Sequence, residues 1–119
     1  MSLFGAQGFD TIIGKGTEFS GNLNLNGVCV IDGLFSGGHI KTAEDKTGKT
    51  HLLVNGSVTC IDIVMSDDLT ISGSISAKEI RVEGNLIIKK QSVLKADKIF
   101  YKSLAVEPSA SIEGQLIHL

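Results

Sequence analysis

The residues with the clearest chemical pattern form the run AEDKTGKT at positions 43–50. It fits a relaxed form of the phosphate-binding loop, with Ala43 where the stricter pattern has Gly. A working loop of this kind joins a strand to a helix, because the helix N-terminus completes the phosphate cradle. Here Thr50 runs directly into the strand-like sequence His51-Leu52-Leu53-Val54. We therefore predict a solvated charged loop without nucleotide binding.

Two histidines flank the same loop and raise the question of a metal site. His39 and His51 could be neighbours in space, and Glu44 or Asp45 could supply a third ligand for a metal such as Zn²⁺. The spacing does not require such a site, and surface histidines at the base of a loop are the simpler interpretation. No catalytic residue, metal or cofactor is expected.

Charge restricts the possible partners. The net charge is −2, and a dedicated nucleic-acid binder needs a clustered basic surface, so no nucleic acid is expected. Five lysines and one acid, Asp97, lie between Lys89 and Lys102. The simpler interpretation is a solvated face. The alternative is a weakly basic surface for anionic lipid or an acidic partner, with about 1 kcal/mol per charge near such a membrane.

The cysteine content and the absence of targeting signals predict a cytoplasmic protein. Cys29 and Cys60 both fall at positions that the repeat described below assigns to the interior, on different faces, so we expect two free buried thiols. The first residues lack the basic region and apolar run of a secretory signal. No segment has the roughly 18 apolar residues that a membrane-spanning helix needs.

The elements that position these residues follow from an aliphatic pattern that recurs every 17 or 18 positions. Three interleaved series share this period: Leu52/Val54, Leu69/Ile71, Leu86/Ile88 and Leu104/Val106; Val58, Ile75, Val93 and Ile112; and Ile63/Met65, Ile80/Val82 and Ile99/Tyr101. Three apolar series with one period predict three flat faces per turn of a coil, which is typical of a β-helix. The fold class is therefore all-β, a single-domain parallel β-helix with a triangular cross-section.

Counting along the series gives six turns, at about residues 12–28, 29–51, 52–68, 69–85, 86–103 and 104–119. The second turn is about six residues too long, and the polar segment 41–50 contains the excess, so it should loop out of the coil. Residues 1–10 show no periodicity and are expected to form a flexible arm, with the β-helix domain spanning 11–119.

The two ends of the coil predict self-assembly. Terminal turns of a β-helix expose unpaired backbone groups, and monomeric solenoids cover them with a helix or a charged segment. The sequence shows no such cap, because the pattern starts at Thr11 and continues to Leu119. We therefore expect end-to-end stacking into filaments. The residues predicted at the polymer interface are Ile12, Ile13, Ile112, Leu116 and Ile117.

The N-terminal arm is a candidate membrane anchor through Leu3 and Phe4. A short apolar arm on one copy would bind a bilayer weakly, but many copies on one polymer would bind by avidity. A disordered tail is the equally simple interpretation.

Several segments resemble the bactofilin domain. The opening TIIGKGTEFSGNLNLNG, the following VIDGLFSGG and the later IFYKSLAVEPSASIEGQL are similar to its first and closing turns, over about residues 11–117. The resemblance implies a right-handed β-helix and a bacterial cytoskeletal protein that polymerises without nucleotide, through head-to-head and tail-to-tail contacts. It also implies binding to the inner membrane face by a short N-terminal segment, and recruitment of cell-wall-modifying enzymes as partners. By the same resemblance, Phe100 falls near an aromatic that serves the C-terminal contact.

Two other functions fit part of the pattern. A left-handed β-helix acyltransferase is suggested by the six-residue spacing of Ile13, Phe19, Leu25 and Ile31, but the later turns break that spacing. A polysaccharide-binding or polysaccharide-cleaving β-helix would normally have more turns and a secretion signal. The favoured interpretation is a non-enzymatic, filament-forming scaffold.

Overall fold

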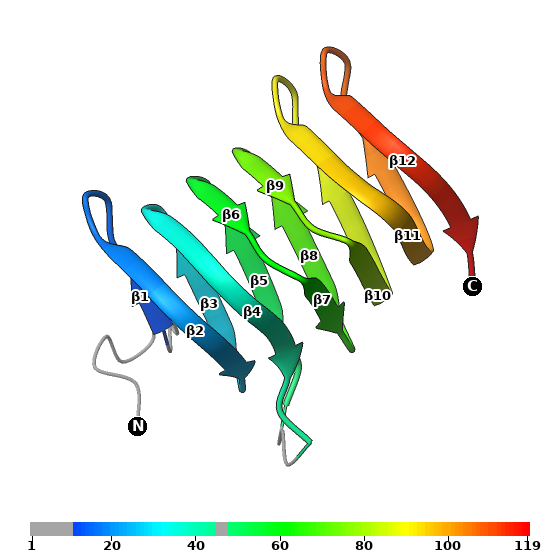
Figure 1. Ribbon diagram of the computed structural model, residues 1–119. Helices are drawn as coiled ribbons and strands as arrows, with labels where there is room; N and C mark the ends of the chain where they lie inside the picture. The colour runs from blue at the N-terminus through cyan, green and yellow to red at the C-terminus, as the bar shows by residue number, and fades with distance from the viewer. Residues whose placement is uncertain (1–10, 45–47) are drawn as a thin grey trace.

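The computed structural model describes residues 11–44 and 48–119, and within them every regular element is a strand. The strands are β1 (Thr11–Ile13), β2 (Glu18–Leu25), β3 (Val28–Ile31), β4 (Leu34–Thr42), β5 (His51–Val54), β6 (Ser57–Thr59), β7 (Asp62–Met65), β8 (Asp68–Ile71), β9 (Ser74–Ser76), β10 (Glu79–Ile88), β11 (Val93–Val106) and β12 (Ser111–His118). They form successive turns of one coil, with β1 and β2 at one end and β11 and β12 at the other (Figure 1). The described residues contain no helix long and apolar enough to cross a bilayer.

Parallel pairing between consecutive turns produces three ladders. Ladder A joins β1, β3, β5, β8, residues 86–88 of β10 and residues 104–106 of β11. Ladder B joins residues 18–20 of β2, 34–36 of β4, β6, β9, residues 93–95 of β11 and 111–113 of β12. Ladder C joins residues 23–25 of β2, 39–42 of β4, β7, residues 79–82 of β10, 98–101 of β11 and 115–118 of β12. The prediction of an all-β parallel β-helix of about six turns is confirmed. Its right-handed sense and its triangular section stay predictions.

Alternation along each strand sends every second side chain inward, where it stacks on its counterpart one turn away. In ladder A, Leu69 lies between Leu52 and Leu86, and all three are fully buried. In ladder B, the rings of Phe19 and Phe35 stack with centroids 5.5 Å apart. Each fully buried aliphatic side chain contributes about 1.5–3 kcal/mol relative to exposure, so the core is a sum of many similar layers.

The expected series through Val93 is wrong by one residue. Leu94, not Val93, pairs with Ile75 on one side and Ile112 on the other. Four residues, 89–92, lie between Ile88 and Val93, whereas only two, 72–73, lie between their partners Ile71 and Ser74 one turn earlier. This longer corner before β11 includes Gln91 in a left-handed conformation with φ of 64°. Adjacent apolar residues at positions 93 and 94 therefore exchange their expected roles, and Val93 faces outward.

The long second turn leaves the coil over a shorter segment than expected. Lys41 and Thr42 continue β4 and pair with β2. Thr50 is fully buried, and its backbone N–H and hydroxyl both donate to the carboxylate of Asp67, at 2.8 and 3.1 Å. The insertion is therefore confined to residues 43–49, of which 45–47 lie outside the described residues. The predicted arm of residues 1–10, with Leu3 and Phe4, also lies outside them.

A column of glycines at the corner between ladders A and B lets successive turns approach closely. Gly33, Gly56 and Gly73 occupy this column, each in contact with the backbone of the preceding turn. A Cβ added to Gly73 would overlap the carbonyl oxygens of Gly56 and Asn55, which belong to backbone and cannot rotate away. Glycine is needed here for space.

We expect Gly73→Ala to lower the free energy of unfolding by about 1–3 kcal/mol, because the new methyl group forces two turns apart. Urea unfolding followed by circular dichroism measures the change. Gly48→Ala is the matched control, since a Cβ there meets nothing within 4 Å, and its effect should stay within about 0.5 kcal/mol. Equal effects of the two substitutions would contradict the close-packed corner.

Candidate functional site

The C-terminal turn exposes part of the hydrophobic core. Val106 and Leu116 point inward like their ladder neighbours Ile88 and Ile99, with which they pair. The neighbours are fully buried, whereas Val106 is 45% and Leu116 is 43% exposed. The difference arises because no further turn of the described chain covers the last layer. This end therefore presents an apolar surface that has the pattern of an interior.

The N-terminal turn differs from the C-terminal turn. Its inward side chains Ile13, Leu23 and Leu25 are buried, with Ile13 only 5% exposed. Ile12 points outward and is 43% exposed. Of the two N-terminal residues predicted at a polymer interface, Ile12 therefore lies on the surface, whereas Ile13 belongs to the core.

Four predicted interface residues gather at the C-terminal end. Ile112 and Leu116 face inward in the last layer, where Ile112 is half-buried. Phe100 and Ile117 pair on the outer side of ladder C. The guanidinium carbon of Arg81 lies 5.6 Å from the centre of the Phe100 ring, which holds this aromatic on the outer rim. The end thus combines an exposed core with an apolar outer rim.

Residues that the sequence prediction left out complete this end. Leu104 and Val106 belong to the last rung of ladder A, and both stood in the periodic series that could have identified them. His118 follows Tyr101 in the register of ladder C, and the two rings meet edge to face with centroids 5.4 Å apart. The Nε2 atom of His118 lies 3.0 Å from the carbonyl oxygen of Lys102. No periodic signal marks a histidine at an inward position.

The backbone at this end has one open edge. Within residues 48–119, β12 pairs only with β11, and residues 104–106 pair only with β10. An unpaired strand edge presents a row of donors and acceptors that can pair with another chain. The C-terminal end therefore offers both apolar side chains and backbone hydrogen-bonding groups in the geometry of one more turn.

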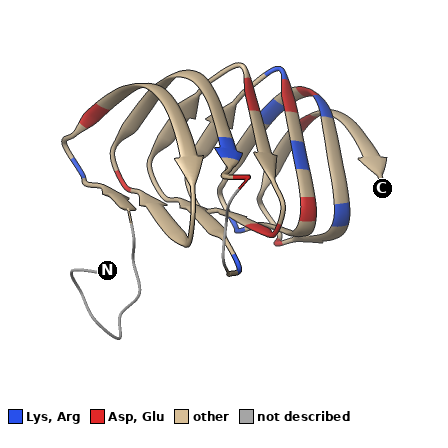
Figure 2. Cartoon of the chain, turned by 90° about the horizontal axis from the view of Figure 1, so that it is seen from below, with Lys and Arg blue, Asp and Glu red and all other residues tan. Residues whose placement is uncertain are grey.

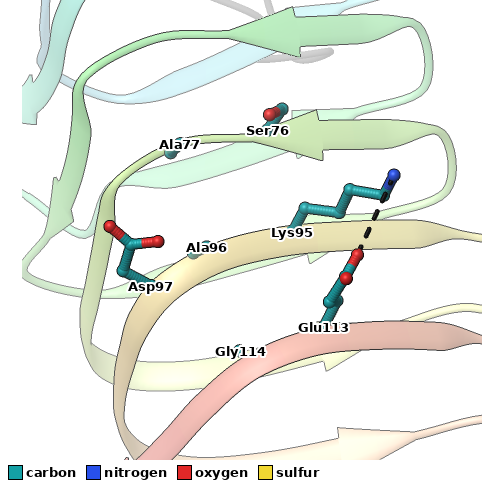
Figure 3. A pocket seen from close by; sticks show the side chains of 7 residues that line it. All are labelled: Ser76, Ala77, Lys95, Ala96, Asp97, Glu113 and Gly114. Atoms are coloured by element: carbon teal, nitrogen blue, oxygen red, sulfur yellow. Dashed lines mark ion pairs between the residues drawn. The ribbon is translucent and has the colours of Figure 1, made fainter.

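A shallow groove of about 440 Å³ lies at the corner between ladders B and C near the C-terminus. Small residues form its floor, among them Ala77, Ala96 and Gly114 (Figure 3). On its rim the side chains of Lys95 and Glu113 form an ion pair at 3.8 Å, whereas Asp97 lies apart from them (Figure 3). Its charged groups thus form one surface ion pair, a contact that contributes about 0–1 kcal/mol.

The histidines that flank the inserted loop have separate partners. The Nδ1 atom of His39 lies 2.7 Å from a carboxylate oxygen of Asp62, and the Nε2 atom of His51 lies 2.8 Å from the hydroxyl of Thr70. Among the described residues, no group of three or more His, Cys, Asp or Glu side chains is arranged to hold a metal ion. The possible third ligand Asp45 lies outside the described residues.

Two of the five lysines of the last turns form ion pairs with acidic side chains. Lys89 lies 3.9 Å from Glu107, and Lys95 forms the pair with Glu113 described above. Figure 2 shows basic and acidic residues interspersed over the C-terminal turns. This mixture favours the interpretation as a solvated face over a uniform basic surface.

Electrostatic contacts tie the first residues of β5 and β8 together. Burial lowers the pKa of His51, and nearby Lys49 adds to this effect while Asp68 opposes it. Burial alone would raise the pKa of Asp68, but the N–H of Asn85 and the ammonium of Lys49 lower it on balance. Asp68 is therefore held as a carboxylate, and these polar groups are satisfied within the subunit.

Both cysteines are free and buried, as predicted. Burial raises the pKa of the Cys29 thiol from its ordinary value of 9.0 to about 11. Burial, with the charge of Asp62 as a second cause, raises the pKa of Cys60 to about 12. Because the thiolate is the reactive form, these thiols are inert at neutral pH.

We expect the native protein to react very slowly with Ellman's reagent at pH 8, and both thiols to react at once after unfolding in guanidinium. The raised pKa values also mean that folding stability falls as pH rises from about 9 toward 11, since unfolded thiols release their protons first. Absorbance at pH 8 measures the rate at which Ellman's reagent labels the thiols. Rapid labelling of the native protein would contradict the burial of Cys29 and Cys60.

The fold and the open last turn define a parallel β-solenoid with an end surface suited to self-association. A scan against family models matches residues 11–117 to a family described as "Bactofilin: Polymer-forming cytoskeletal". The match covers nearly the whole chain, so this protein belongs to the bactofilin family, a family of polymer-forming cytoskeletal proteins with a β-helix fold. The sequence resemblance is thereby confirmed. Searches among curated proteins and among solved structures gave no match.

Proposed function

We propose that this protein is a non-enzymatic cytoskeletal scaffold that assembles end to end into filaments. The observation that supports this most directly is the exposed core of the last turn, where Val106 and Leu116 lie at inward positions without a covering layer. A second copy placed against this end would bury them as Ile88 and Ile99 are buried one turn earlier. Membership in a polymer-forming family supports the same conclusion.

The interactions that hold neighbouring turns together can also hold two copies together at this end. Every added backbone hydrogen bond contributes about 0.5–1.5 kcal/mol net, and buried apolar area contributes about 25 cal/mol per Å². Neither contribution needs a nucleotide. The run at 43–50 leads directly into strand β5, where a phosphate site would have a helix, and the backbone N–H and hydroxyl of Thr50 both donate to Asp67. We therefore propose assembly that is independent of nucleotide.

The family resemblance extends the proposal to location and partners. We propose that the filament lies in the cytoplasm at the inner membrane face, held there by Leu3 and Phe4, and recruits cell-wall-modifying enzymes. Avidity supports this arrangement, because a filament presents many copies of a weakly binding arm. The rival acyltransferase function loses support from the family match, which names a cytoskeletal protein.

We expect the purified protein to form filaments in negative-stain images without nucleotide or metal, and Leu116→Arg to abolish them, because a charge would be buried at the end contact. Ile61→Arg is the matched control. Ile61 is 47% exposed at a corner in the middle of the coil, so its substitution should leave filaments intact. Circular dichroism checks that both variants fold.

Filaments of Leu116→Arg that match the wild type would rule out the proposed end contact. Uniform small trimers of the wild type would instead favour the acyltransferase interpretation.

We expect filaments to pellet with liposomes of anionic lipid, and deletion of residues 2–9 to reduce the pelleted fraction several-fold, since each copy loses its apolar arm. Filament formation by the deletion variant is verified first by negative stain, so that avidity is unchanged. Equal pelleting with and without the arm would remove Leu3 and Phe4 from the account.

A further inference from the structure

An apolar column runs along the outside of ladder A from the first turn to the last. Its six members pair in register from turn to turn, and five of them are apolar: Ile12, Val30, Leu53, Thr70, Ile87 and Ala105. Alternation along a strand that faces solvent on one side normally places polar residues at such positions. These six side chains do not belong to the inward series of ladder A, so packing in the core does not explain why five of them are apolar.

The column is open in part, because Val30 and Thr70 are buried and the other four members are half-buried or exposed. Ile12 is 43% exposed, Ala105 is exposed, and Leu53 and Ile87 are half-buried. Thr70, the polar member, has its hydroxyl 2.8 Å from Nε2 of His51. The accessible part of the column is therefore apolar, and the hydroxyl of the buried Thr70 already has a partner.

Polar residues flank the column on both sides and bond to one another along the coil. On one side, the side-chain amide of Asn85 donates to Asp68 at 3.2 Å. On the other side, Asn55 donates to Asp32 at 2.8 Å. Lys89 and Glu107 lie on that second side as well, 3.9 Å apart. We call the column and these two flanks outer face A. The surface of another protein molecule could cover outer face A while these polar groups keep their partners. Burial would then leave none of them without a hydrogen bond or ion pair, which is the main free-energy cost of burying polar groups.

Charge on the flanks selects an occupant and an orientation. Consider a second copy related by a two-fold axis that lies along the strands, between the third and fourth turns. The second turn of one copy then lies opposite the fifth turn of the other, so Asp32 faces Lys89 on one flank. On the other flank, by the same symmetry, His51 of the third turn faces Asp68 of the fourth, but burial lowers the pKa of His51, so Asp32 and Lys89 form the pair of opposite charges.

A parallel arrangement lacks this complementarity. If the two-fold axis runs along the coil instead, each turn of one copy lies opposite the same turn of the other copy. Each flank of one copy then lies opposite the other flank of its partner. Asp32 then faces Val28, and Lys89 faces Asn85, so no pair of opposite charges forms. The antiparallel arrangement alone pairs the charges, and it does so twice because the contact is two-fold symmetric.

We propose that outer face A is the lateral contact between two antiparallel copies of this chain. The two apolar columns pack face to face as sheets do, about 10 Å apart, with Asp32 and Lys89 of opposite copies paired at the edge. The contact is separate from the proposed end contact. In a filament it repeats with every subunit, so a weak contact per copy becomes a stable pairing of filaments.

A charge swap in the Leu116→Arg background tests the contact with the end surface blocked. Sedimentation velocity should show a monomer–dimer equilibrium for this protein. Added Asp32→Lys or Lys89→Asp should each raise the dimer Kd about tenfold, because two attractive pairs become repulsive. The two changes together should return the Kd to its starting value, since Lys at 32 then faces Asp at 89 of the other copy.

Lys95→Asp is the matched control, because Lys95 pairs with Glu113 at 3.8 Å much as Lys89 pairs with Glu107 at 3.9 Å, but on ladder B. It should leave the Kd unchanged. Absence of a dimer, failure of the double swap to restore it, or an equal effect of Lys95→Asp would overturn the lateral contact.

The same variants without Leu116→Arg are scored by filament width in negative stain. Paired filaments are expected for the wild type and the double swap, and single filaments for each single substitution. If the wild type forms dimers that obey the charge swap but no filaments, the end contact is wrong and the lateral contact stands. Single wild-type filaments would overturn the lateral contact and leave the end contact intact.

Discussion

The structure depends on one repeated interaction, the packing of an inward aliphatic side chain against the same position one turn away. Ile80 lies between Ile63 and Ile99 in ladder C, belongs to the core cluster and is fully buried. A turn is therefore stable only between two neighbours, as in other solenoids. The same rule leaves Leu116 exposed in the last turn. The same inward aliphatic pattern thus forms the core in the middle turns and an exposed apolar surface at the last turn.

Sequence periodicity predicted most of the fold because this interaction repeats at a nearly fixed spacing. The ladder from Leu52 to Leu104 is as expected. The prediction failed at the corner before Leu94, where two added residues shift the register without changing the composition and Gln91 adopts a left-handed conformation. It also placed Thr50 in the loop, because its burial depends on a bond to Asp67 in the next turn.

The candidate site was predicted where it continued the inward pattern and missed where it did not. Ile112 and Leu116 follow the series, and the structure places both in the last layer. His118 has no periodic signal, and the outer column with Leu53 and Ile87 was overlooked because alternation was used only to find the core. Two surfaces of different geometry, one at the end and one along the side, suit a protein that builds a polymer.

The central claim is that assembly completes the coil by covering its last turn. Amide hydrogen exchange measured on assembled filaments and on the Leu116→Arg protein tests it residue by residue. The account predicts that assembly slows exchange most in β12 and in residues 104–106, with little change in β6 and β7 at the middle of the coil. Exchange in β12 that is equally fast in both samples would contradict it.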